Sequence, residues 1–377
     1  MKNLESLIVK YLEGNLIKEE AVHLEELLKK NENKVHFKEF IHLKHLINSK
    51  TEFNYEKELS QFKRKANKTI KLRPLLKYAA AILIFASAGY FFLAKDKPSN
   101  EPSIIIVNNN IKAGTDKATL TLDDGTNVVL EKGQQYNTEN LNSTGEKLVY
   151  NTPKYTKSEI IYNYLTIPRG GQYFVKLSDG TQVWLNSESQ LKYPVSFKAG
   201  ETRKVELIYG EAYFDVSPSI AHQGSVFKVY NKKQEIQVLG TTFNIRAYQD
   251  EAAIYTTLVE GKVSISTSTK KEMLIPNQQS KVNIIDNEMT LSVVDVNNII
   301  SWKDGIFDFE GKSLKEIMKV LSRWYDMEVE FENEALKQER FNGRIKKSYS
   351  IEDILTAIKN TNIIKNYEIN NKKVILK

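Results

Sequence analysis

Residues 173–185 read YFVKLSDGTQVWL, two short runs of alternating apolar residues on either side of Asp179-Gly180. An Asp-Gly pair supplies the positive φ values of a type I′ turn, whose twist matches that of the flanking strands. The same pattern occurs over residues 118–130, ATLTLDDGTNVVL, with Asp124-Gly125 at the turn. The two stretches predict tight β-hairpins and look like an internal repeat.

The hairpin pattern extends over about half of the chain. From residue 104 to residue 294, short alternating or β-branched runs recur about every eleven residues, separated by Gly, Asn, Asp and Pro. This spacing predicts an all-β domain over residues 112–295. Further strands are expected at 203–208, 211–216, 234–239, 242–248, 253–259 and 262–266.

The pattern changes after Trp302. GIFDF predicts a short strand, and Ser313 with Glu316 forms the S-x-x-E capping box of a helix. Two strands, a second helix capped by Ser350 and a final hairpin follow, in the order βαββαββ. Residues 300–377 are therefore expected to form a small α+β domain, separate from the β domain.

The net charge of +7 is concentrated in fifteen residues, 63–77, which carry seven basic and no acidic side chains. An uncharged apolar run, residues 78–94, follows directly and predicts one transmembrane helix. Because the basic residues precede it, the N-terminus is expected in the cytoplasm. The run begins too late for a signal peptide, so we expect it to be retained. A basic cluster can also bind nucleic acid, but beside an apolar run it indicates topology, and we expect no direct nucleic-acid partner.

Residues 1–62 show helical periodicity. One apolar stripe falls on a first helix and another on a second, and too little core is available for about 60 residues to be stable alone. Such helices dock on a partner or form a self-contained bundle, and composition leaves both open. The candidate partner-binding residues are Leu4, Leu7, Ile8, Tyr11, Leu24 and Leu28.

Catalytic and metal-binding motifs are missing from the sequence. It has no cysteine, no phosphate-binding glycine motif, no HExxH and no nucleophile elbow. His42 and His45 lie one helical turn apart, but structural zinc usually recruits thiolates, so we expect scattered surface histidines. A Ser-His-Asp triad outside the first 62 residues would have to use His222. We expect no enzyme activity on a substrate, no cofactor and no metal.

Several blocks in sequence order resemble the FecR family of membrane-anchored anti-sigma factors. They are LSDGT (177–181), VWLNS (183–187), GEAYFDV (210–216), VLGTTFN (238–244) and LVEGKV (258–263). The tail, with GIFDF (305–309), RWY (323–325) and FNG (341–343), looks like the C-terminal domain that accompanies this module in glycan- and siderophore-uptake regulators.

The resemblance implies a partner on each side of a membrane. Residues 1–62 would hold an extracytoplasmic-function sigma factor, and the periplasmic part would contact the signalling domain of a TonB-dependent outer-membrane transporter. The tail's strand order is similar to the short secretin and TonB N-terminal fold. Its candidate contact residues are Phe307, Phe309, Trp324 and Tyr325. The tryptophans that cytoplasmic domains of the family often carry are missing from residues 1–77.

Some members of the family cleave themselves at a Gly-Thr peptide by an N-to-O acyl shift. The matching peptide here is Gly240-Thr241. The alternative is that Gly240 only turns the chain between two strands, and the sequence leaves both open.

These expectations give a multi-domain fold class. Its parts are a small all-α cytoplasmic segment (1–62), a basic juxtamembrane segment (63–77), one transmembrane helix (78–94), a periplasmic linker (95–111), an all-β periplasmic domain (112–295) and a C-terminal α+β domain (300–377). The predicted function is that of a single-pass inner-membrane anti-sigma factor. The alternatives are a membrane-tethered periplasmic binding or scaffold protein and a surface hydrolase.

Overall fold

The structure, a computed structural model, describes residues 109–151 and 160–377 and the backbone of 105–107. In the N-terminal part it describes residues 18–30 and the single positions 4, 7, 8, 10, 11, 33, 34 and 37. The chain divides into two compact units, Met1–Ile104 and Ile105–Lys377.

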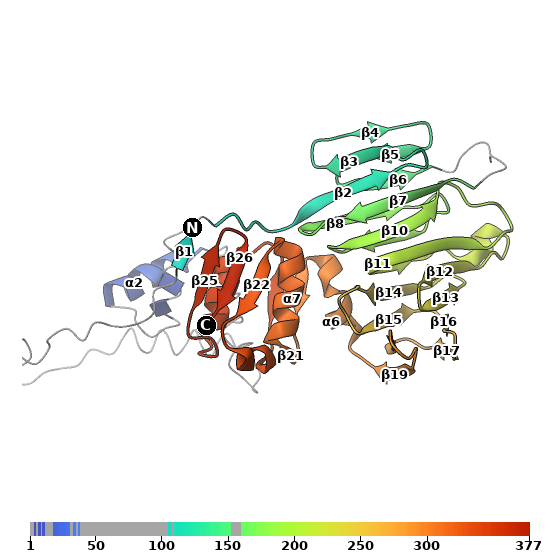
Figure 1. The fold of residues 1–377 in the computed structure, drawn as a ribbon. Coiled ribbons are helices and arrows are strands. Elements are labelled where there is room, and N and C mark those ends of the chain that lie inside the picture. Colours follow the sequence, from blue (N-terminus) through green and yellow to red (C-terminus); the bar gives the residue numbers. More distant parts are fainter. Residues whose placement is uncertain are drawn as a thin grey trace, which may run out of the picture. The chain divides into compact units, whose positions relative to one another are not determined.

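The second unit is dominated by a β sandwich, which we define as residues 115–293 (Figure 1). Its strands are β2 (Thr115–Thr121), β3 (Asn127–Glu131), β4 (Tyr136–Asn137), β5 (Leu141–Ser143), β6 (Lys147–Tyr150), β7 (Tyr162–Ile167), β8 (Gly171–Lys176), β9 (Gln182–Leu185), β10 (Ser189–Pro194), β11 (Arg203–Asp215), β12 (Phe227–Asn231), β13 (Gln234–Val238), β14 (Thr242–Ala247), β15 (Ala253–Glu260), β16 (Val263–Ser266), β17 (Lys271–Leu274), β18 (Gln278–Asn283) and β19 (Met289–Val293). A short 3-10 helix, η1 (Ser219–His222), precedes β12.

Two ladders of strands form the sandwich. One runs β3-β2-β7-β10-β11-β12-β13-β16-β17, with a parallel pair at β11-β12. The other runs β4-β5-β6-β8-β9-β11-β14-β15-β18-β19, with a parallel pair at β6-β8. Alternate residues of most strands point inward, so both ladders contribute to one hydrophobic core.

Strand β11 belongs to both ladders. The sequence predicted two strands here, 203–208 and 211–216, but the chain continues as one strand through Gly210, whose φ is +96°. A side chain on Gly210 would meet the backbone of Ser189 at 2.4 Å, so only glycine fits this crossing point.

The two predicted hairpins are confirmed as β2-β3 and β8-β9. The predicted type I′ turns are wrong. Such a turn needs a positive φ at both central residues, and of Asp179 and Gly180 only Gly180 has one. Gly180 N–H donates to the Leu177 carbonyl at 2.9 Å, and Leu177 N–H donates to the Thr181 carbonyl at 2.8 Å. This is a three-residue loop with glycine in the left-handed position, and Asp179 stabilises it by accepting from Thr181 N–H at 3.0 Å.

The C-terminal region, residues 295–377, packs two helices on a mixed sheet of order β1-β25-β26-β22 (Figure 1). Its elements are α6 (Val296–Ile300), η2 (Ser301–Asp304), β20 (Ile306–Asp308), β21 (Lys312–Ser313), α7 (Leu314–Tyr325), β22 (Glu328–Phe331), η3 (Glu334–Gln338), β23 (Arg340–Phe341), β24 (Arg344–Lys346), α8 (Ile351–Lys359), β25 (Tyr367–Asn370) and β26 (Lys373–Leu376). Strand β1 (Ile105–Val107) comes from the predicted linker and pairs in parallel with β25. The predicted capping box at Ser313 is confirmed, and Ser350, the predicted cap of the second helix, also forms a capping box, with Asp353.

The first unit contains α2 (Lys18–Leu27) and a small cluster of buried apolar side chains. The cluster contains Leu4, Leu7, Ile8, Leu24, Leu28 and Phe37.

The predicted fold class is wrong. The described chain is mostly β, and the predicted separate α+β domain joins the sandwich in one compact unit that also takes in a linker strand. Among the described helices, the longest has 12 residues, and none is long and apolar enough to cross a membrane. The predicted transmembrane run, 78–94, and most of residues 1–62 lie outside the described residues.

Candidate functional site

The sandwich and the C-terminal region meet at a polar junction centred on α7. Arg323 of α7 has a side chain only 5% exposed and forms ion pairs with Glu188 at 3.1 Å, Asp250 at 2.5 Å and Glu251 at 3.3 Å. Its guanidinium carbon lies 3.5 Å from the centre of the Tyr248 ring. Burial alone would lower the pKa of Arg323, but Tyr248 and the carboxylates raise it above its ordinary value. We call these five residues the arginine cluster.

A second buried cation lies beside it. Lys347 is 3% exposed, and its Nζ lies 3.7 Å from the centre of the Trp324 ring and 5.8 Å from those of Trp302 and Phe307. The ammonium donates to Gln172 Oε1 on β8 at 2.8 Å. Burial lowers the pKa of Lys347 to about 7, with Glu211 opposing the shift. We call Lys347 and its three aromatic neighbours the lysine cage.

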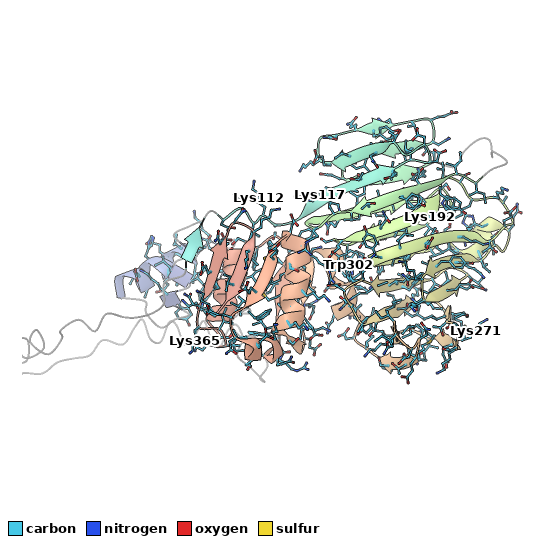
Figure 2. The ribbon with its side chains drawn as sticks, in the orientation of Figure 1. Lys112, Lys117, Lys192, Lys271, Trp302 and Lys365 are labelled. Carbon is cyan, nitrogen blue, oxygen red and sulfur yellow. The ribbon has the colours of Figure 1, made fainter. Side chains whose placement is uncertain are left out.

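A chain of hydrogen bonds links the cage to the sandwich. Trp302, from η2 and labelled in Figure 2, donates from Nε1 to Asn244 Oδ1 at 3.3 Å. Asn244 Nδ2 donates to Glu211 Oε1 at 3.0 Å, and Asn186 Nδ2 donates to the other carboxylate oxygen at 2.9 Å. Burial raises the pKa of Glu211. The network therefore connects η2 to β11, to β14 and to the residue that follows β9.

Hydrogen bonds to backbone carbonyls at and just after the end of α7 complete the junction. Gly170 N–H donates to the Arg323 carbonyl at 2.7 Å, and Arg169 Nη2 donates to the carbonyls of Ser322 and Met327 at 2.7 and 2.8 Å. The loop before β8 thus provides a donor to the Arg323 carbonyl in the last turn of α7, where a helix leaves carbonyls without intrahelical partners. Ion pairs and hydrogen bonds, several of them between buried groups, therefore connect the sandwich to the C-terminal region.

The predicted receptor-contact residues lie in the core of the C-terminal region. Phe307, Phe309, Trp324 and Tyr325 are between 1% and 5% exposed. Phe307 stacks on Phe309 with ring centres 5.8 Å apart and meets Trp324 edge-on at 6.4 Å. The structure brings these side chains together but buries them, so their role in receptor contact stays a prediction.

The predicted sigma-binding residues also pack on one another. Leu4, Leu7, Ile8, Leu24 and Leu28 are at most 6% exposed, and Tyr11 packs against them partly buried. Val22 of α2 is 57% exposed and lies outside this cluster. The sigma-binding role stays a prediction; of the six predicted residues only Leu24 lies on α2, where it is buried and Val22 is exposed.

The Gly240-Thr241 peptide lies where the chain crosses from β13 in one ladder to β14 in the other. Gly240 has a φ of +143°, and a side chain there would approach Pro218 Cα to 2.9 Å. Thr241 is 5% exposed, and its hydroxyl donates to the Lys262 carbonyl at 3.0 Å. The turn accounts for the glycine, and cleavage stays the untested alternative for this peptide.

No group of three metal-ligating side chains occurs in the part of the chain that the structure describes. His42 and His45 lie outside it. His222 accepts or donates a hydrogen bond with Ser217 Oγ at 2.8 Å, and no carboxylate bond to His222 is seen among the described residues.

The sequence patterns did not predict the charged residues of the junction. Glu211 and Arg323 are charged side chains with buried neighbours and fall within the quoted family blocks, whereas Lys347 lies between exposed residues. A charge inside an otherwise apolar block was the available signal, because such a residue is rarely buried unless it is paired.

Known families match both parts of this unit, in order. Residues 163–264 match the family described as FecR protein, and residues 306–376 match the one described as FecR, C-terminal. The chain carries both domains of the FecR family. Two crystal structures, at 1.65 and 2.50 Å resolution, are similar to this chain; each is described as a "putative anti-sigma factor" from Parabacteroides distasonis ATCC 8503. Each shows 27% identity and a TM-score of 0.51, over 57% of this chain and 98% of the other. No curated protein matches the sequence.

Proposed function

We propose that this FecR-family chain is an anti-sigma factor that holds an extracytoplasmic-function sigma factor through its N-terminal unit. An anti-sigma role is supported by the two family matches and by the similarity to the Parabacteroides distasonis protein. FecR regulators are not enzymes as a family, and we propose no substrate for this chain.

The proposed location is the inner membrane, with the N-terminus in the cytoplasm and residues 105–377 in the periplasm. The supporting observation is the uncharged run at 78–94 directly after seven basic residues. The proposed periplasmic partner is the signalling domain of a TonB-dependent outer-membrane transporter.

The junction is the observation that carries the proposed signalling mechanism. A partner that binds the C-terminal region acts on a body whose two parts are joined by the arginine cluster and the lysine cage. Such a body transmits a displacement instead of absorbing it. The signal would then reach the cytoplasmic sigma-binding helices through the residues before β1.

The sigma-factor partner is tested by co-purifying residues 1–77 with the sigma factor encoded beside this gene. We expect a complex at micromolar concentration. Leu24→Asp, in the cluster core, should abolish the complex together with helical content. Val22→Asp, on the exposed side of α2, should weaken the complex while circular dichroism stays unchanged.

Failure to form any complex at micromolar concentration would refute the anti-sigma proposal. It would favour the alternative, a membrane-tethered periplasmic scaffold protein. A complex that Val22→Asp leaves intact would retain the function but place the contact elsewhere on the N-terminal unit.

A further inference from the structure

A pocket of about 590 Å³ opens beside the turn between β8 and β9. Its walls come from four places: that turn, residues 149–151 at the end of β6, the loop 197–200 before β11, and the segment from η1 to Ser225. The volume lies within the range of small-molecule sites. None of the junction residues lines it.

Arg203 forms the buried base of the pocket, with 1% of its surface exposed. Its Nη1 donates to Asp179 Oδ2 at 2.8 Å and to the Ser217 carbonyl at 3.0 Å, and its Nη2 donates to the Ser225 carbonyl at 3.1 Å. Its guanidinium carbon lies 5.3 Å from the centre of the Phe227 ring. The pair with Asp179 is neutral overall, and the bonds of Arg203 connect the β8-β9 turn to residues on both sides of η1.

Two polar groups at this base have no partner in the described structure. Arg203 Nε and Ser225 Oγ are both buried without a hydrogen bond, although 93% or more of each residue is buried. Native proteins rarely leave such groups unpaired, and an unpaired buried group calls for an explanation such as a water, an ion or a ligand. Both groups can donate, so a ligand would have to bring acceptors.

The charged side chains that line the pocket also favour a ligand with acceptor oxygens and negative charge. Lys176 and Lys198 line the pocket and form no ion pair with any described residue. With Arg203, they give three positive charges against the single carboxylate of Asp179, a net charge of +2. His222 adds none at neutral pH, because burial and then Arg203 lower its pKa. The remaining walls include apolar atoms of Leu177, Phe197 and Ala221.

We infer that this pocket binds a small organic anion, a sugar-sized molecule that carries a carboxylate or phosphate group. The charged group would lie between Lys176 and Lys198, where two ammonium groups lack counter-ions. Acceptor oxygens would reach the donors at the base, and the apolar walls would contact the carbon skeleton. This binding site is independent of the anti-sigma role and of the junction.

Titration calorimetry on the detergent-purified full chain tests the inference, at pH 7 and low salt. The probes are D-glucuronate, D-glucose 6-phosphate and neutral D-glucose. We expect at least one anion to bind at least tenfold more tightly than glucose, and the tighter of the two identifies the preferred head group. No binding by either anion at 10 mM would overturn the inference, as would equal binding of glucose.

Variants then locate the site. Lys176→Gln combined with Lys198→Gln should weaken binding of the anion at least tenfold. Ser225→Ala, which removes an unpartnered hydroxyl, should weaken it about threefold without lowering the thermal midpoint. Lys192→Gln is the matched control, because Lys192 lies on β10 (Figure 2) outside the pocket lining and over the rings of Tyr162 and Tyr164. Undiminished binding by the double variant would place the anion elsewhere and overturn the inference.

Discussion

Arg323 is the residue on which the junction depends most. Replacing it with alanine leaves Glu251, whose side chain is 7% exposed, as a buried carboxylate with fewer partners. Breaking a buried ion pair from one side costs about 3–5 kcal/mol. We therefore expect Arg323→Ala to lower the free energy of unfolding by about 3 kcal/mol, measured by urea denaturation of residues 105–377.

Lys319→Ala is the matched control for Arg323. Lys319 lies one turn earlier on α7 and pairs with the same Asp250 at 2.9 Å, but both side chains are partly exposed. Solvent-exposed pairs contribute less than about 1 kcal/mol, so this variant should be close to neutral. If both substitutions lowered the free energy of unfolding equally, burial of the arginine cluster would not increase its contribution to stability.

Lys347 should make the stability of this unit depend on pH. Its folded pKa of about 7 lies below its ordinary value of 10.5. Between these values the unfolded chain binds more protons, so the free energy of unfolding rises with pH. From pH 7 to pH 9 the rise from this residue is about 2 kcal/mol at most. We expect Lys347→Met to flatten the dependence of the thermal midpoint on pH over that interval.

The slope between pH 7 and pH 9 is the diagnostic quantity for Lys347. Lys192→Met, on the outer side of β10, should keep the slope of the unmodified protein. If Lys347→Met also kept that slope, the lysine cage would not be the source of the pH dependence.

At the scale of elements, the sequence predicted hairpins and helix starts, but it did not predict which distant strands pair. The alternation in 173–185 and 118–130 gave both hairpins, and S-x-x-E gave the start of α7, because these signals depend on neighbours in the sequence. The sequence predicted two strands where β11 is one, because Gly210 resembles a turn residue. Its real reason, the close approach of Ser189, joins residues far apart in the sequence and has no local signal. The parallel pairs β11-β12 and β1-β25 join distant segments and leave no local signal.

The packing of the segment between β1 and β2 against Trp324 can be tested at Gly114. A Cβ atom there would lie 2.6 Å from Trp324 Cε3, so this segment packs closely on the lysine cage. We expect Gly114→Ala to displace it and to speed hydrogen exchange of amides in β1 and β25. Gly343→Ala is the control, because a Cβ atom there meets nothing within 4 Å. Unchanged exchange in β1 would show that the strand is held independently of Gly114.

The crossing from β13 to β14 bears on self-cleavage. Because the Thr241 hydroxyl is held by the Lys262 carbonyl and Gly240 is explained by its approach to Pro218, we expect the peptide to stay intact. Mass spectrometry of the purified full chain should give one species, and Thr241→Ala should not change the pattern. Fragments ending at Gly240 that disappear in Thr241→Ala would establish cleavage instead.

At the scale of the whole molecule, the sequence treated residues 95–111 as a linker and so left out part of the C-terminal region. Composition changes near Trp302, and that change suggested a boundary. The structure places β1 and the buried Ile111, both far upstream of that boundary, in the sheet and core of the C-terminal region. A composition shift marks a change of local architecture, and it does not show whether the two parts share contacts.

A fragment comparison tests whether the unit is one body. The C-terminal region alone, 295–377, lacks β1, Ile111 and the Gln172 acceptor of Lys347, and it leaves Arg323 without its three carboxylate partners. The sandwich fragment 112–295 keeps its own core and should stay folded. We expect residues 105–377 to unfold in one transition, with coincident midpoints by circular dichroism and by tryptophan fluorescence, and the fragment 295–377 to unfold at a markedly lower urea concentration. Equal midpoints for 295–377 and 105–377 would mean that the C-terminal region is stable by itself and that the junction joins two independent domains.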